Sequence, residues 1–278
     1  MVRSLRQGHF PGAPKMLALA AMLTAITGAA TGEEPTAAAQ AGFDAYVQKV
    51  EARLDVAHRR PETYLAPVDW QRVRAGEPVI ENLTVKSEAE LPGALIHDWR
   101  GTAFAPGATA ADFERVLRDF ADYPKNFAPQ VEAVRVLEED AGEDSDEDAD
   151  RDAGRASVTM RVKQQHVITV VLDTDYDIRS ARLDERHGTI ASRSTRVAEI
   201  GADGRGLSAS EEHGFLWRMN TYWSYEERDG GVYMQIESVS LTRSIPAGLG
   251  WVVGPFVESV PRESIEFTLR AVLKALKE

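Results

Sequence analysis

Five polar residues in or beside long alternating segments could take part in chemistry. The main candidates are Arg161, His166 and Arg193, and the other two are Glu237 and Arg243. A polar group turned into an apolar interior is costly unless it is paired, so each is a candidate contact for a ligand. His166 is the best candidate for a general base, because imidazole titrates near neutral pH. The sequence identifies no partner for it. An outward position on a strand is the ordinary alternative for all five residues.

Other patterns of catalysis and metal binding do not occur in the sequence. There is no Gly-rich phosphate loop, no histidine pair at metal-ligand spacing and no Gly-x-Ser-x-Gly nucleophile motif. The chain has no cysteine, which excludes disulfides and thiolate chemistry. The aspartates at 144, 146, 148 and 150 alternate as in a calcium loop, but Ala149 and Arg155 stand where that loop needs Gly and Glu. We therefore expect no catalytic residue, no metal and no cofactor.

The charge of the chain argues against several classes of partner. The formal net charge of the 278 residues is -12, which disfavours nucleic acid and an anionic membrane surface. Much of this charge lies in residues 138–152, which include ten acidic residues, and we expect a solvated acidic hairpin loop over 138–154. With 43% hydrophobic and 27% charged residues, the composition is typical of a soluble globular protein.

The beginning of the chain has the pattern of a secretion signal. Arg3, Arg6 and Lys15 precede an apolar run over residues 16–26, and the small residues after it suit cleavage near residue 30. The run is too short to span a bilayer comfortably, although an uncleaved anchor is the alternative. We expect a signal peptide over 1–30 and an exported protein, periplasmic or secreted, with at most transient membrane contact.

The elements that must position any functional side chain are mostly strands. Residues 31–90 form a predicted N-terminal extension and linker, with a helix over 43–57 where apolar residues recur three and four apart. Thr109 is a good N-cap for a helix that Tyr123-Pro124 ends, and a second short helix follows. The sequence predicts strands at 80–86, 94–104, 131–138, 156–164, 167–178, 188–200, 215–227 and 232–242. An apolar stripe through Ile265 and Leu269 predicts a C-terminal helix.

This order predicts an α+β fold. We expect a curved antiparallel sheet of six to seven strands wrapped around the long C-terminal helix, with two short helices after the first strand. The predicted domain covers residues 91–278. A sheet and a helix in two layers leave a space between them, which is a core if large side chains fill it and a pocket if they do not.

Four short motifs resemble the START-like (SRPBCC) helix-grip superfamily, which includes pollen allergens, polyketide cyclases and coenzyme Q-binding proteins. They are Phe-Ala-Pro-Gly at 104–107 before a helix, Asp-Phe-Ala-Asp-Tyr-Pro at 119–124, Tyr-Trp-Ser-Tyr-Glu at 222–226 before Gly230-Gly231, and the terminal helix after Gly254-Pro255. Together they cover about residues 94–278 in the order of that superfamily. The resemblance implies a cavity between sheet and C-terminal helix that takes up an apolar small molecule.

Alternation in the strands assigns residues to this cavity. Bulky residues share one face of the 215–227 segment, and serines recur toward one end of the facing strand, an arrangement that suits an amphiphilic ligand. Plain core packing is the alternative for each residue. The predicted lining is Phe113, Leu117, Phe127, Met160, Trp217, Met219, Thr221, Trp223, Tyr225, Met234, Ile236, Ser238, Ile265 and Leu269, with Arg161, His166 and Arg193 as polar candidates.

The sequence therefore predicts binding, and possibly transport, of a hydrophobic small molecule or lipid without chemistry. Gly248, Gly250 and Gly254 are the candidate gate, because they would let the connector before the last helix flex. A polyketide cyclase or aromatase is the enzymatic alternative, and it needs an inward Arg161 or His166. A third interpretation is that the protein is an envelope interaction module with a filled core, which binds no small molecule.

Overall fold

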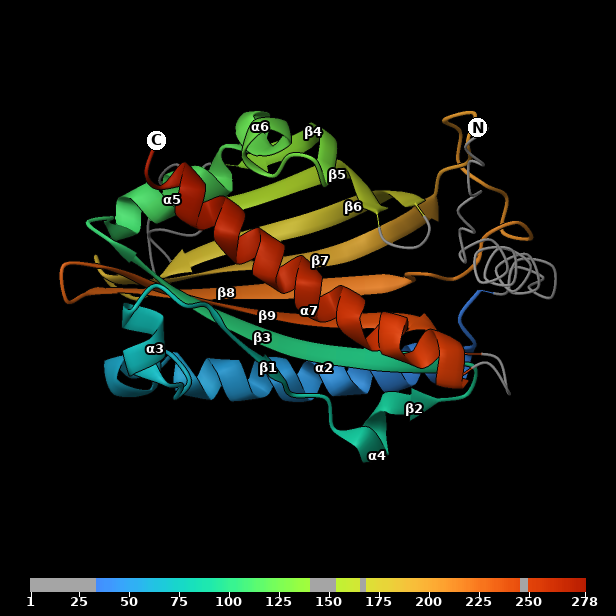
Figure 1. Ribbon diagram of the computed structural model, residues 1–278, viewed down its shortest axis with the longest axis horizontal. Coiled ribbons are helices and arrows are strands. Elements are labelled where there is room, and N and C mark those ends of the chain that lie inside the picture. Colours follow the sequence, from blue (N-terminus) through green and yellow to red (C-terminus); the bar gives the residue numbers. More distant parts are fainter. Residues whose placement is uncertain (1–33, 141–153, 166–168, 246–249) are drawn as a thin grey trace, which may run out of the picture.

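The long alternating segments pair into one curved antiparallel sheet of nine strands (Figure 1). The computed structural model describes residues 34–140, 154–165, 169–245 and 250–278, and only the backbone at 140, 165 and 250–258. The strand order is β1-β3-β9-β8-β7-β6-β5-β4, and β2 also pairs with β3. The strands are β1 Val79–Asn82, β2 Glu90–Leu91, β3 Ala94–Pro106, β4 Val131–Asp140, β5 Gly154–Gln165, β6 Thr169–Arg182, β7 His187–Glu199, β8 Arg218–Arg228 and β9 Gly231–Arg243.

The sheet has more strands than the predicted six to seven. The short strands β1 and β2, which come from the predicted extension, both pair with β3. The strand predicted at 80–86 is confirmed in part as β1, whereas β2 has only two residues, too few for alternation to be recognised. The predicted hairpin between β8 and β9 is confirmed, since Asp229 and Gly230 form its turn with φ angles of 57° and 75°. Consecutive left-handed residues match the twist of two paired strands.

The C-terminal helix α7, Gly250–Ala275, crosses one face of the sheet, as predicted (Figure 1). We call this the inner face. The short helices α5, Ala110–Arg118, and α6, Tyr123–Asn126, follow β3 on the same side, with the 3-10 turn η2, Phe120–Asp122, between them. The side chain of Thr109 caps α5 by accepting from the backbone N–H of Asp112 at 3.2 Å, which confirms the predicted start of the helix. The chain therefore has the predicted helix-grip arrangement.

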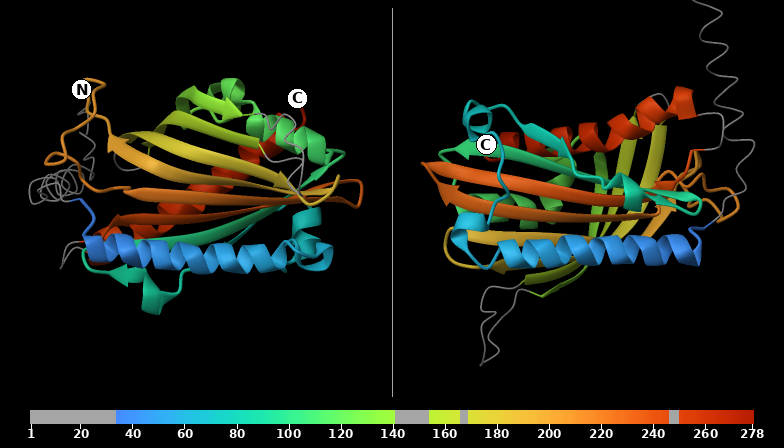
Figure 2. Two further views of the ribbon diagram at one scale, coloured as in Figure 1. Left: turned by 180° about the vertical axis from the view of Figure 1, so that it is seen from behind. Right: turned by 90° about the horizontal axis from the view of Figure 1, so that it is seen from below.

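The opposite, outer face is covered by the N-terminal part of the chain (Figure 2). Helix α2, Ala37–Ala57, buries Phe43 and Tyr46 against the outer face of β3 and β9. The other helical elements described between residues 34 and 93 are the 3-10 turn η1, Pro61–Thr63, and the short helices α3, Trp70–Arg74, and α4, Lys86–Ala89. The sheet is thus packed on both faces, and residues of the predicted extension contribute to its hydrophobic interior.

Several predictions concern residues outside the described ranges. The signal peptide over 1–30, most of the acidic loop, His166 and Gly248 all lie there. Within the described residues, no helix is long and apolar enough to cross a membrane. In the same part of the chain, no group of three or more His, Asp or Glu side chains could hold a metal ion.

Candidate ligand-binding site

The inner face of β8 and β9 presents the side chains that the sequence assigned to it. Trp223 pairs with Ile236 and Tyr225 with Met234 across the two strands, and all four side chains are buried under α7 and α5. Successive side chains of a strand point to opposite faces, so the same register places Thr221 and Ser238 on this face too.

One end of the inner face is filled by aromatic rings, and we call it the ring end. The Phe113 ring of α5 lies 5.5 Å from the Trp223 ring and 4.9 Å from the Tyr225 ring, measured between centroids. Gly101 of β3 lets α7 approach closely, because an added Cβ would lie 2.4 Å from Ile265 Cγ2. The residues of the prediction that belong to this cluster are Phe113, Leu117, Phe127, Trp223, Tyr225, Met234, Ile236, Ile265 and Leu269, and Met160 packs against them.

A buried polar group closes the ring end. The Tyr225 hydroxyl donates to Glu114 of α5, and the same carboxylate accepts from Arg182 of β6. Burial, followed by the hydrogen bond to Glu114, raises the pKa of Tyr225, so its phenol stays protonated at neutral pH. The cavity beside Glu114, Arg118 and Arg182 measures only about 40 Å³. That volume suits a water molecule and not an organic ligand.

The other end of the inner face is polar and less tightly covered, and we call it the hydroxyl end. It lies at the same end of the sheet as the beginning of α7 (Figure 1). Thr221 pairs with Ser238, which pairs with Trp99, and Met219 pairs with Ser240. Thr221, Met219 and Trp99 are only half-buried although they lie on central strands. Thr221, Met219 and Trp99 are thus partly accessible in this stretch of the inner face, whereas Ser238 and Ser240 are buried.

Three of the predicted residues lie away from this face. Arg161 lies on the outer face of β5 and donates to both carboxylate oxygens of Asp173 at 2.7 Å. Arg193 donates to Glu51 of α2 at 2.7 Å, also on the outer face. Trp217 precedes β8 and packs against the outer-face cluster, because the alternation of side chains applies only within the strand.

The gate glycines are placed differently from the prediction. Gly250 and Gly254 lie within α7 and not in the connector before it. The prediction ended the connector at Gly254-Pro255, but the helix continues through Pro255. The segment between β9 and α7 is therefore limited to residues 244–249. Gly248 lies in the part of that segment outside the described residues.

A buried acidic pair lies on the outer face, where Glu237 is one of the predicted polar candidates and Asp98 is not. Asp98 and Glu237 lie under α2, where Tyr46 donates to Asp98 at 2.9 Å and Arg53 pairs with Glu237. Burial, with the nearby charge of Glu237 as the next cause, raises the pKa of Asp98 to about 7, and burial also raises the pKa of Glu237. The sequence signal is a single acidic residue in each strand, Asp98 in β3 and Glu237 in β9, and an acidic residue in a strand normally indicates a solvent-exposed position.

Comparison with known proteins finds similar architectures only among solved structures. No protein-family model and no curated protein matches the chain. A STAR-related lipid transfer protein from Xanthomonas axonopodis is 16% identical with a TM-score of 0.43, over 72% of this chain and 99% of that one. The Zhui aromatase/cyclase from Streptomyces sp. R1128 is 17% identical with a TM-score of 0.40, over 66% and 94%. Human STARD10 is 11% identical with a TM-score of 0.40, over 76% and 80%. The helix-grip arrangement of this chain is established by its own strand order and by α7 across the inner face.

Proposed function

We propose that this protein binds an amphiphilic, largely hydrophobic small molecule or lipid between the sheet and the first half of α7. The observation that carries the proposal is that Met219, Thr221 and Trp99 are only half-buried on the inner face, whereas the ring end is filled. A polar head group finds hydroxyls at Thr221, Ser238 and Ser240. The apolar part lies toward Met219 and Trp99, where burial contributes about 25 cal/mol per Å² of apolar surface.

The proposal places the ligand at the hydroxyl end, because the ring end is occupied by the protein's own side chains. Ile265 and Leu269 belong to the second half of α7, and their side chains pack directly on β3. Entry would require the beginning of α7 to move. We therefore propose that the beginning of α7 is the gate, and that a larger residue at Gly250 slows ligand exchange.

Binding without chemistry is favoured over catalysis. The enzymatic alternative needed an inward Arg161 or His166. Arg161 pairs with Asp173 on the outer face, and His166 lies outside the described residues. An amphiphile held by hydroxyls and apolar contacts needs no activated group. Transport of the ligand is the natural extension of reversible binding.

Export is a second part of the proposal and rests on the sequence alone. Three basic residues precede the apolar run over 16–26, which is the order of a secretion signal. N-terminal sequencing of the protein purified from whole cells tests it. A mature chain that begins near residue 31 is expected, and a chain that retains residues 1–30 and stays in the cytoplasm would contradict export.

Titration with a fluorescent fatty acid tests the binding site. The variant Thr221→Trp fills the hydroxyl end, and we expect it to weaken binding at least about tenfold, equivalent to 1.4 kcal/mol. The matched control is Thr195→Trp, which adds the same side chain at an exposed position of β7. Equal affinities of wild type and Thr221→Trp, with both folded by circular dichroism, would reject this site.

A further inference from the structure

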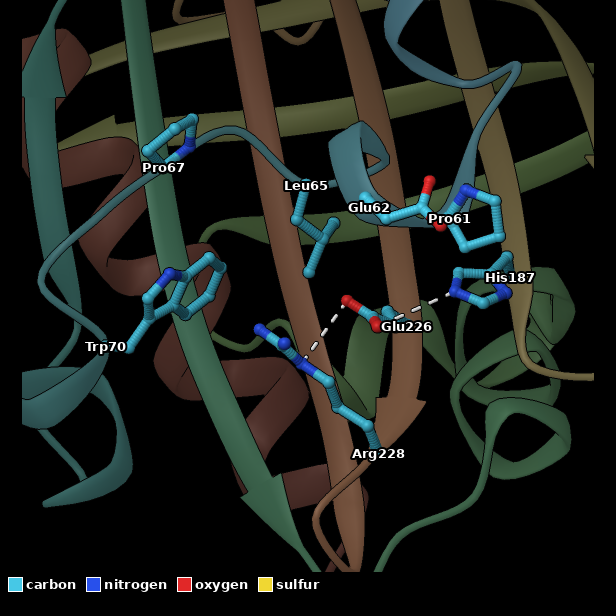
Figure 3. A pocket seen from close by; sticks show the side chains of 8 residues that line it. All are labelled: Pro61, Glu62, Leu65, Pro67, Trp70, His187, Glu226 and Arg228. Atoms are coloured by element: carbon cyan, nitrogen blue, oxygen red, sulfur yellow. Dashed lines mark ion pairs between the residues drawn. The ribbon is translucent and has the colours of Figure 1, made fainter.

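A cavity of about 380 Å³ lies on the outer face of the sheet, away from α7 (Figure 3). Its apolar side chains come from the segment that follows α2, namely Pro61, Leu65 and Pro67, and from Trp70 at the start of α3. Its polar side chains come mostly from β7 and β8, more than a hundred residues later in the chain. The volume is within the range of pockets that hold small molecules.

The segment over this cavity is fixed to the sheet. The side-chain amide of Gln235 donates to the carbonyl of Ala66 and accepts from its backbone N–H, both at 2.8 Å. Tyr64 is buried, and its ring lies 5.0 Å from the imidazole of His187. The apolar wall of the cavity is therefore preformed.

His187 turns an unpartnered nitrogen toward the cavity. Its Nδ1 lies 2.8 Å from Asp184 Oδ1, which also accepts the backbone N–H of Arg186 at 2.8 Å. Since a carboxylate only accepts, Nδ1 carries a proton, and whenever the ring is neutral Nε2 is an acceptor. The His187 side chain is 9% exposed, and Nε2 has no hydrogen-bond partner among the described residues.

Glu226 places a second acceptor beside the first. Its Oε1 lies 3.6 Å from His187 Nε2, and its side chain is 14% exposed. Figure 3 shows Glu226 between His187 on one side and Arg228 on the other. Among the described residues, His187 Nε2 is a buried atom without a hydrogen-bond partner, and a donor placed between it and Glu226 Oε1 would satisfy it.

Arg228 does not supply that donor. Its Nε lies 3.3 Å from the other carboxylate oxygen of Glu226, Oε2. Its guanidinium lies over the rings of Trp70, at 4.8 Å, and Tyr233, at 4.5 Å, which holds it against the opposite wall. The positive charge of Arg228 balances the negative charge of Glu226, and Glu62 adds a second negative charge to the lining. The cavity is thus net negative when His187 is neutral.

We propose that this outer-face cavity binds a small organic cation, a protonated amine on an apolar or aromatic body. The ammonium group donates to Nε2 of His187 and to Oε1 of Glu226. The body of the ligand packs against Leu65, Pro67 and Trp70. This site is separate from the hydroxyl end of the inner face, so the protein has two ligand sites on opposite faces of one sheet.

Titration of the full chain with three probes of similar size tests the charge preference: benzylammonium, benzyl alcohol and benzoate. We expect benzylammonium to bind most tightly and to shift the NMR signals of the His187 ring and the Trp70 indole. The isosteric variant Glu226→Gln removes the charge and should weaken benzylammonium at least about tenfold, as expected for loss of a charge-assisted hydrogen bond. The control Glu139→Gln, at an exposed position of β4, should bind like wild type.

Three outcomes would overturn the proposal. They are tighter binding of benzoate than of benzylammonium, equal affinity in Glu226→Gln and wild type, and no binding of benzylammonium or phenethylammonium at millimolar concentration. Thr221→Trp separates this site from the fatty acid site. This variant should weaken fatty acid binding and leave benzylammonium binding unchanged. The two proposed sites are therefore tested independently of each other.

Discussion

The phenolic hydroxyl of Tyr46 in α2 donates to Asp98 Oδ2 of β3 at 2.9 Å, and this buried contact joins the N-terminal helix to the sheet. Glu237 of the neighbouring strand β9 lies on the same face and interacts with Asp98 electrostatically. The docking of α2 therefore depends on how two buried carboxyl groups are protonated.

Stability should fall as the pH rises because of Asp98. Its pKa is raised to about 7 in the folded protein, mainly by burial, whereas an aspartate of the unfolded chain titrates near 4. The folded state thus holds a proton that the unfolded state has lost, and this contribution is complete below about pH 4 and lost as the pH rises through 7. We expect Asp98 to account for about 1–3 kcal/mol of this loss.

Urea unfolding at a series of pH values measures the effect. Asp98→Asn should flatten the decline in the free energy of unfolding between pH 4 and 8. Asp55→Asn, at an exposed position of α2, should keep the wild-type profile. An unchanged decline in Asp98→Asn would show that this carboxyl group is not responsible.

Gly101 should be required for the close packing of α7. An added Cβ would lie 2.4 Å from Ile265 Cγ2 and 2.7 Å from Leu269 Cδ1, so Gly101→Ala forces the helix away from β3. We expect a loss of about 1–3 kcal/mol in the free energy of unfolding. Gly206→Ala is the control, because an added Cβ there meets no atom within 4 Å. Equal stability of the two variants in urea would contradict the direct contact.

The polar group at the ring end should contribute to stability as a unit. Tyr225→Phe removes one donor to Glu114 and is expected to cost about 1–2 kcal/mol. Glu114→Ala removes the acceptor of both Tyr225 and Arg182 and should cost more, about 2–4 kcal/mol. A double-mutant cycle by urea unfolding measures the coupling between Tyr225 and Glu114. A coupling energy near zero would be inconsistent with the buried hydrogen bond.

Helix α2 should be an integral part of the folded protein. Phe43 is completely buried against the outer face, and Phe43→Ala is expected to cost about 3–5 kcal/mol in one cooperative transition. The control Val56→Ala changes a residue that is 63% exposed and should stay within about 0.5 kcal/mol of wild type. Separate unfolding of α2 before the sheet, seen by two-step denaturation, would argue that it is only loosely attached.

The inner face could be predicted from the sequence because its signals are local. Trp223 and Tyr225 share one face of a long strand, and Asp229 and Gly230 form the turn after it. Thr109 caps helix α5, which packs on the same face. Each of these patterns reports on a few neighbouring residues. These local patterns were sufficient to predict the antiparallel sheet and the helix that covers its inner face.

The outer face could not be predicted, because its partners are distant in sequence. Glu237 resembles a solvent-exposed residue until Arg53 of α2 pairs with it, 184 positions earlier. Similarly, the outer-face cavity combines Trp70 with His187 and Glu226, and no spacing along the chain relates them. The strands β3 and β9 are buried on both faces, so alternation there indicates which residues share a face but not which face meets solvent.

Photocrosslinking with a diazirine-bearing fatty acid, followed by mass spectrometry of the labelled peptides, is the most direct test of ligand binding at the inner face. The labels should fall near Thr221 of β8 and Ser238 of β9, and unlabelled fatty acid should compete for them. Labels confined to α2 or to the segment around Leu65 on the outer face, with none on the inner face of β8 and β9, would contradict the account.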